Sequence, residues 1–122
     1  MQSSLQKEYN VFWLAFADDL PVGYAKLKFH SLNKIVISGA ASQLQKIYVL
    51  KDFLHQQIGL ALLESVIEEA QKTANTHLWL SVLYTNERAI RFYEKHGFVK
   101  TVQQVTSVAE QDFTFETMVK AF

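Results

Sequence analysis

The first stretch whose residues could do chemistry runs from Leu44 to Gly59. An apolar segment is followed there by a short polar connection and then by a helical pattern. Such a connection delivers the amino terminus of a helix beside the end of a strand, where unpaired N–H groups and the helix dipole favour an anion, typically a phosphate. Gly59 would let a ligand approach the backbone closely. Taken alone, this stretch is also consistent with an ordinary strand-to-helix turn, because one glycine is not a glycine-rich loop.

The second stretch begins at Asn86 and ends at Gly97-Phe98, directly after another apolar segment. Its pattern, N-x-x-A-x-x-F-Y-x-x-x-G-F, combines a helix-start residue with a terminating glycine. Tyr93 lies inside this pattern. By itself it would be interpreted as a core aromatic residue.

Composition limits the classes of protein that can hold these stretches. The 122 residues suit a single domain, and 49% hydrophobic with 20% charged residues excludes a disordered chain. Lys+Arg and Asp+Glu are both 12, so no bulk basic field favours nucleic acid or a membrane surface. The absence of cysteine excludes disulfides and a cysteine nucleophile and suits a reducing compartment. We therefore expect a cytoplasmic protein without a secretion signal, a nucleic-acid partner or a membrane partner.

Hydrophobic periodicity predicts the elements that position the two stretches. Residues 11–17, 24–30, 44–50, 78–84, 98–108 and 113–119 predict strands, with turns at 18–23 and 110–112 and a loop at 38–42. Residues 35–37 are a further candidate strand, and the polar segment 3–10 predicts a fraying helical end. Apolar side chains at helical spacing predict one helix over 58–73, and a second is predicted over 87–95.

The order of these elements indicates the fold class. The strand, helix and strand from Leu44 to Tyr84 form a βαβ unit, whose strands should be parallel with a right-handed crossover. The flanking hairpins make the rest of the sheet antiparallel. The sequence therefore predicts one domain over residues 1–122, of the α/β (α+β) class, with a mixed, mostly antiparallel sheet and helices on its faces.

The Asn86–Phe98 pattern, together with I-Y-V-L and I-G-L-A-L-L-E further upstream, resembles the GNAT superfamily of N-acetyltransferases. The resemblance runs from about Phe12 to the carboxyl terminus. Within the superfamily, the sequence is similar to the bacterial branch that includes polyamine acetyltransferases. It implies that strands 44–50 and 78–84 splay apart and that the pantetheine arm of acetyl-CoA enters the gap. It also implies acetyl transfer to a primary amine, small-molecule or peptide, by direct attack, with no metal.

The resemblance assigns roles to individual residues. Tyr93 matches the tyrosine beside the thioester sulfur, where its O–H can protonate the leaving thiolate, because an ordinary tyrosine pKa of about 10 keeps that proton available. Asn86 would contact the cofactor arm, and the Val49 N–H is a candidate donor to the thioester oxygen. The remaining expected contacts are backbone groups of Ile47, Tyr48 and Val49 for pantetheine, and Leu54, His55, Gln56, Gln57, Ile58, Gly59, Leu60 and Ala61 for the pyrophosphate.

The pyrophosphate loop departs from the family pattern, which is usually Q/R-x-x-G-x-G/A. With Gly59 aligned to the last glycine, Leu54 stands at the usual Gln/Arg, and Gln57 replaces the first glycine and brings a Cβ close to the phosphate path. A register shifted by two residues reads Gln56-x-x-Gly59-x-Ala61 and satisfies the pattern. We prefer the first register, because it keeps the helical stripe in phase.

Two more departures concern the front of the fold and the general base. Family members usually have a strand and two helices before the hairpin that begins near Val11. This chain has room for only the last turn of them, so we expect a truncated front and an open sheet edge that a second subunit of a homodimer could cover. Gln43 and Gln45 stand where a carboxylate is usual. His30, His55 and Glu87 are the remaining candidates for the base.

These departures keep another class of function open. The chain would then be a non-catalytic CoA-binding or dimerising module, or an inactive fragment of a longer acetyltransferase. Binding of acetyl-CoA would distinguish the enzyme and the CoA-binding module from an unrelated α/β fold. Turnover over a panel of amines separates the enzyme from the module.

Overall fold

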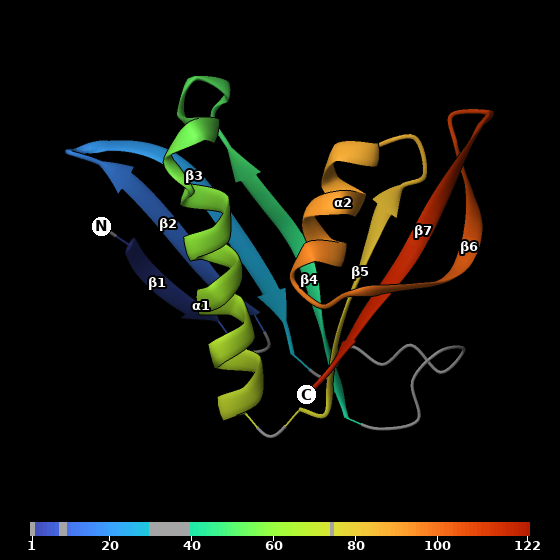
Figure 1. Ribbon diagram of the computed structural model, residues 1–122, viewed down its shortest axis with the longest axis horizontal. Helices are drawn as coiled ribbons and strands as arrows, with labels where there is room; N and C mark the ends of the chain where they lie inside the picture. Colours follow the sequence, from blue (N-terminus) through green and yellow to red (C-terminus); the bar gives the residue numbers. More distant parts are fainter. Residues whose placement is uncertain (1, 8–9, 30–39, 74) are drawn as a thin grey trace.

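The computed structural model describes residues 2–7, 10–29, 40–73 and 75–122, which form one mixed sheet and its covering helices (Figure 1). The strand order is β1-β2-β3-β4-β5-β7-β6, and every neighbouring pair except β4–β5 is antiparallel. The predicted fold class is therefore confirmed. The strands are β1 (Gln2–Lys7), β2 (Asn10–Ala17), β3 (Leu20–Lys28), β4 (Ala41–Val49), β5 (His77–Leu83), β6 (Val99–Val108) and β7 (Gln111–Ala121), and the helices are η1 (Lys51–Gln56, a 3₁₀-helix), α1 (Ile58–Lys72) and α2 (Glu87–Lys95).

Both α-helices lie on the same face of the sheet, α1 over β2–β4 and α2 beside β5 (Figure 1). The core fills the space between the helices and the sheet. The apolar stripe predicted for α1 supplies Leu62, Leu63 and Val66, all fully buried. The opposite side of β2–β5 is covered by no helix among the described residues, and we call it the helix-free face; by strand register it presents Phe12, Leu14, Tyr24, Lys26, Lys46 and Tyr48.

Strand β1 shows that the helical end predicted for residues 3–10 is wrong. Gln2–Lys7 pairs antiparallel with β2, from Gln2 opposite Ala15 to Lys7 opposite Asn10. A six-residue segment is too short for a stable helix, whereas the edge of β2 offers it a ready hydrogen-bonding ladder. The edge of β2 that we expected to be open is therefore covered by β1, so it no longer argues for a homodimer, which stays a prediction.

Several element boundaries also differ from those predicted. β3 begins at Leu20, β4 at Ala41 and β7 at Gln111, each inside a segment predicted as turn or loop. The β6–β7 hairpin closes through Ala109 and Glu110, both at positive φ, without the Asn-Gly or Asp-Gly pair that usually marks such a turn. The predicted bounds of α2 are confirmed, and α1 ends one residue early. The candidate strand 35–37 and His30 lie outside the described residues.

The feature that positions the site is the divergence of β4 from β5. The two strands pair in parallel only from Ala41 opposite His77 to Gln43 opposite Trp79. Immediately beyond, Gln45 forms a bulge in β4, since Leu44 and Lys46 oppose consecutive residues of β3. A bulge bends its strand and increases its twist. The predicted splay is therefore confirmed, and Figure 1 shows the two strands opening into a V.

Hydrogen bonds hold the closed end of this V. The buried Ser42 hydroxyl donates to Asn75 Oδ1 at 2.9 Å, and Asn75 Nδ2 donates to the Ala70 carbonyl at 2.9 Å. The Ala40 carbonyl accepts from both the N–H and the hydroxyl of Thr76, each at 2.9 Å. These bonds tie the start of β4 to the end of α1 and to the start of β5. The two strands are thus fixed where they meet and free to diverge beyond it.

Candidate active site

The open part of the V is a cleft of about 670 Å³. It brings together seven of the residues predicted from the sequence: Ile47, Tyr48, Val49, Leu54, Gly59, Asn86 and Tyr93. The other predicted contacts do not line the cleft: Gln56 ends η1, Gln57 follows it, and Ile58, Leu60 and Ala61 lie in the first turn of α1. The side chain of His55 lies outside the description.

The edge of β4 that faces the cleft carries backbone groups with no β5 partner. The Leu50 N–H donates to the Val22 carbonyl at 2.8 Å, and the Tyr48 carbonyl oxygen would lie 2.8 Å from a Cβ placed on Gly23. Residues 48 and 50 thus direct their backbone groups at β3. Because backbone groups alternate sides along a strand, Ile47 and Val49 direct theirs into the cleft. Of the three predicted backbone contacts, Tyr48 therefore offers only its side chain.

The amino terminus of α1 lies against this edge. A Cβ on Gly59 would sit 3.8 Å from the Val49 side chain and 4.0 Å from Phe92. The Ala61 N–H makes the first intrahelical bond, to the Gln57 carbonyl at 3.1 Å. The N–H groups of residues 58–60 come before that bond and have no partner within the helix. This is the helix terminus at which the sequence predicts an anion, and that role stays a prediction.

Gln57 joins η1 to α1 with φ +56° and ψ 24°, in the left-handed region where the family has glycine. A residue with a Cβ in this region costs about 1–2 kcal/mol, partly offset by the larger unfolded-state entropy of glycine. We therefore expect Gln57→Gly to raise the free energy of unfolding by about 0.5–1 kcal/mol in urea denaturation. The matched control is Gln56→Gly, because Gln56 does not have a positive φ. This variant should lower the free energy of unfolding. Equal destabilisation by both variants would contradict the strain at Gln57.

Tyr93 comes from the buried side of α2 and lines the cleft. It is 7% exposed and packs edge-on against Phe92 and Phe98, with ring centroids at 5.4 and 5.6 Å. Burial raises the pKa of Tyr93 to about 12. The phenol therefore keeps its proton throughout the physiological range and can only donate to an anion formed beside it.

The raised pKa of Tyr93 predicts how stability changes at alkaline pH. The folded state binds the phenolic proton more tightly than the unfolded state, whose tyrosine pKa is about 10. The resulting stabilisation is complete below pH 10 and is lost as the pH rises toward 12, by up to about 3 kcal/mol. Urea denaturation between pH 9 and 12 measures it, and Tyr93→Phe should flatten the decline. The same steep decline in the variant would assign the loss to other groups.

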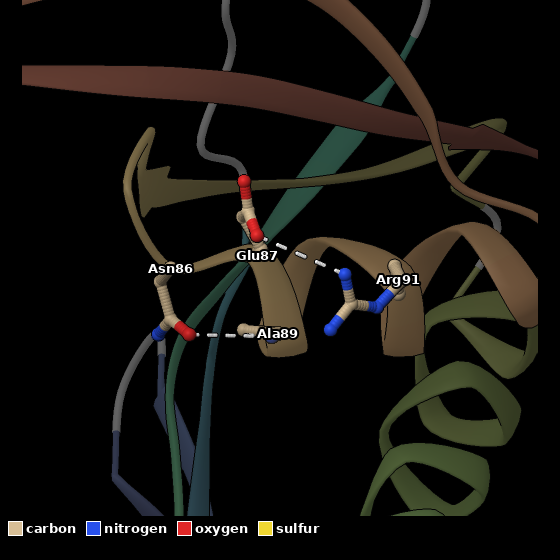
Figure 2. Close-up of polar contacts among 4 residues, drawn as sticks. All are labelled: Asn86, Glu87, Ala89 and Arg91. Atoms are coloured by element: carbon tan, nitrogen blue, oxygen red, sulfur yellow. Dashed lines mark hydrogen bonds and ion pairs between the residues drawn. The ribbon is translucent and has the colours of Figure 1, made fainter.

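Asn86 caps α2, as Figure 2 shows, with its Oδ1 accepting from the Ala89 N–H at 3.2 Å. Because the carbonyl oxygen makes the cap, the Nδ2 amide group of Asn86 is not used in it. Asn86 also lines the cleft.

Glu87, a candidate base, lies on the exposed side of the helix, 3.9 Å from Arg91. It does not line the cleft. Such an exposed pair contributes little to stability.

Two cations of the cleft were missed by the sequence analysis. Arg88 of α2 lines the cleft, as does Lys46 of β4. Arg88 lies four residues before Phe92 and so shares its helix face, a spacing that could have identified it. Among the described lining residues there is no carboxylate and no histidine, so neither a base nor an acidic patch is built into these walls.

No group of three or more metal-binding side chains occurs in the ranges that the structure describes. Over the same ranges, no helix is both long and apolar enough to span a membrane.

The comparisons with known proteins agree with this geometry. The sequence is 28% identical over 94 residues to an uncharacterised N-acetyltransferase of Lactobacillus delbrueckii, covering 77% of this chain and 54% of that protein. It is 37% identical over 73 residues to the ribosomal protein bS18-alanine N-acetyltransferase of Escherichia coli, covering 60% of this chain and 48% of the relative. The chain thus spans about half the length of these relatives.

A solved structure extends the likeness over nearly the whole chain. Arabidopsis thaliana NAA60, determined with a bisubstrate analogue, superposes with a TM-score of 0.82 over 95% of this chain and 78% of that one, at 17% identity. At this identity the match shows the fold alone. The family model described as the acetyltransferase (GNAT) family matches residues 2–98. With most of its length matched by that model, and with the split sheet and capped α2 described above, this chain belongs to the GNAT acetyltransferase family.

Proposed function

We propose that this chain transfers an acetyl group from acetyl-CoA to a primary amine. The observation that carries the proposal is the unpaired edge of β4, which faces Tyr93 across one cleft. An extended amide-bearing arm can pair with that edge as an added strand would, at Ile47 and Val49. The pyrophosphate then lies against the N–H groups of residues 58–60, with Arg88 as a further cation beside it.

The chemistry follows from the groups around the cleft. The neutral amine attacks the thioester carbon, and the carbonyl oxygen becomes an oxyanion that the Val49 N–H stabilises. The C–S bond then breaks, and the proton lost by the nitrogen replaces the one that Tyr93 gives to the thiolate. Atoms and protons balance, because the thiolate takes the Tyr93 proton and Tyr93 regains a proton from the nitrogen. No covalent bond to the protein forms.

An amine that arrives neutral needs no strong base in the cleft. Lys46 lowers the pKa of a bound ammonium, since like charges disfavour the charged form. An α-amine, with an ordinary pKa of about 7.7–8.0, loses its proton far more readily than a lysine-like amine at about 10.4. We therefore infer that an α-amino group is the preferred acceptor. The relatives named for alanine and N-alpha acetylation support this choice.

The proposal is tested first by melting the protein with and without acetyl-CoA, and then by turnover. Saturation at about 100 times Kd should raise stability by about 2.7 kcal/mol. Acetylation is then measured on a peptide α-amine and on spermidine, and the peptide should react faster at pH 7.5. A melting shift without turnover of any amine would instead support a CoA-binding module. No shift at millimolar acetyl-CoA would overturn both.

A further inference from the structure

The helix-free face has an uneven charge that the proposed chemistry does not require. Strands β2–β5 contain Lys26, Lys28 and Lys46 but no aspartate or glutamate, in a chain whose net charge is zero. The chain therefore concentrates cations on the strands beside the cleft while its carboxylates lie elsewhere.

Two of these lysines face each other directly. Lys26 of β3 and Lys46 of β4 are cross-strand partners on the helix-free face. Like charges directly opposite each other destabilise a sheet. Neither ammonium forms an ion pair with any residue that the structure describes. A pair of like charges that no ion pair among the described residues offsets is typical of a functional site.

Lys46 is placed for a ligand that enters the cleft, and Lys26 lies opposite it on β3, with its ammonium directed toward β2. Lys46 lines the cleft itself, and the Lys26 ammonium is held 5.3 Å from the centre of the Phe12 ring. The next row toward the open end is the pair Tyr24 and Tyr48, whose rings are 5.9 Å apart and also line the cleft. Lys46 and two tyrosine rings thus line the cleft on the helix-free face, and Lys26 lies beside them on that face.

We propose that the helix-free face binds a peptide acceptor whose amino-terminal residues carry carboxylates, with Lys26 and Lys46 as the residues that determine this specificity. The inference rests on the proposed function, because it concerns the acceptor of that same cleft. Two rows of cross-strand partners on β2, β3 and β4 make up this face, namely Leu14–Tyr24–Tyr48 and Phe12–Lys26–Lys46. Each row is about 10 Å long across the three strands, and the two rows are about 7 Å apart along them. Such an area suits several residues of an extended chain better than a free amino acid. The α-amine enters the cleft, and the acidic side chains lie over the lysines.

The test compares two peptides that differ only in charge, one with aspartate and one with asparagine at positions two and three after an amino-terminal alanine. At pH 9 both α-amines are mostly neutral, so kcat/KM reports recognition. We expect the aspartate peptide to be favoured about three- to tenfold at low salt, and the preference to shrink as salt screens the charges. K26Q with K46Q should bring the ratio near one, and K46E should invert it. Lys72→Gln, an exposed lysine on α1, is the matched control and should keep the ratio.

The outcomes separate this inference from the proposed function. Acetylation of the asparagine peptide tests the function, whereas the ratio of the two peptides tests the lysines. An unchanged ratio in K26Q/K46Q, or a wild-type preference for asparagine, overturns the inference and leaves the function standing. If neither peptide is acetylated, calorimetry on the CoA-saturated protein compares the affinities of the two peptides and so tests the role of the lysines. Equal affinities overturn the inference there, and a free aspartate that competes as well as the peptide overturns the peptide assignment.

Discussion

Tyr93→Phe should lower kcat by about 10²–10³-fold while the KM for acetyl-CoA changes little. The variant removes a single oxygen from a ring that stays packed between Phe92 and Phe98. What is lost is the donor to the leaving thiolate, an interaction made only as the C–S bond breaks. Such a loss appears in kcat rather than in ground-state binding.

Steady-state kinetics with a peptide α-amine measure this effect, and Tyr84→Phe provides the matched control. Tyr84 follows β5, is 53% exposed and does not line the cleft, so the same substitution there should leave kcat unchanged. A parallel loss of kcat and of acetyl-CoA affinity in Tyr93→Phe would instead assign Tyr93 a packing role. Because the pKa of Tyr93 is about 12, the wild-type rate should also show no decline up to about pH 10.

Val49→Pro should lower kcat by about 10²–10³-fold, the range measured when one donor to an oxyanion is removed. Proline deletes the N–H that Val49 directs into the cleft. The ladder with β3 survives, because the neighbouring residues 48 and 50 direct their groups there. Proline is accepted in strands where the missing N–H does not belong to the ladder. The loss should therefore fall on catalysis with the fold retained.

Two further variants separate the N–H from the side chain and from the fold. Val49→Ala keeps the N–H while shortening the side chain, and we expect it to retain most of the activity. Tyr48→Pro removes a group directed at β3 and should lower the melting temperature markedly. Equal kcat in Val49→Pro and Val49→Ala, with both proteins folded by circular dichroism, would place the oxyanion donor elsewhere.

The elements that local chemistry determines were predicted closely. Asn86 as cap and Gly97 as terminator lie at the two ends of α2, and the bounds predicted for α2 match. β1 was missed because Gln2–Lys7 is polar and becomes a strand only through the edge of β2. No short-range signal in such a segment distinguishes a strand from a frayed helix.

The sequence predicted seven of the residues that line the cleft, but not how these residues are arranged. The opening of the V depends on a bulge at Gln45, which is a property of the β3–β4 register. The same register decides that Lys26 faces Lys46 and that Ile47 and Val49, rather than Tyr48, present backbone groups to the cleft. Register is set by contacts between strands far apart in the chain, so these features became visible only in the folded molecule.

Beyond Gln43, β4 has no partner strand on its β5 side, so this part of β4 is an unpaired edge in the middle of the sheet. Exposed edges invite pairing with other chains, and proteins usually blunt them with charges, prolines or covering segments. Under the proposed function, the arm of acetyl-CoA would cover this edge, at the positions that a neighbouring chain would take. Supply of acetyl-CoA would then govern not only turnover but also resistance to edge-to-edge aggregation, and the empty protein would be the form most prone to self-association.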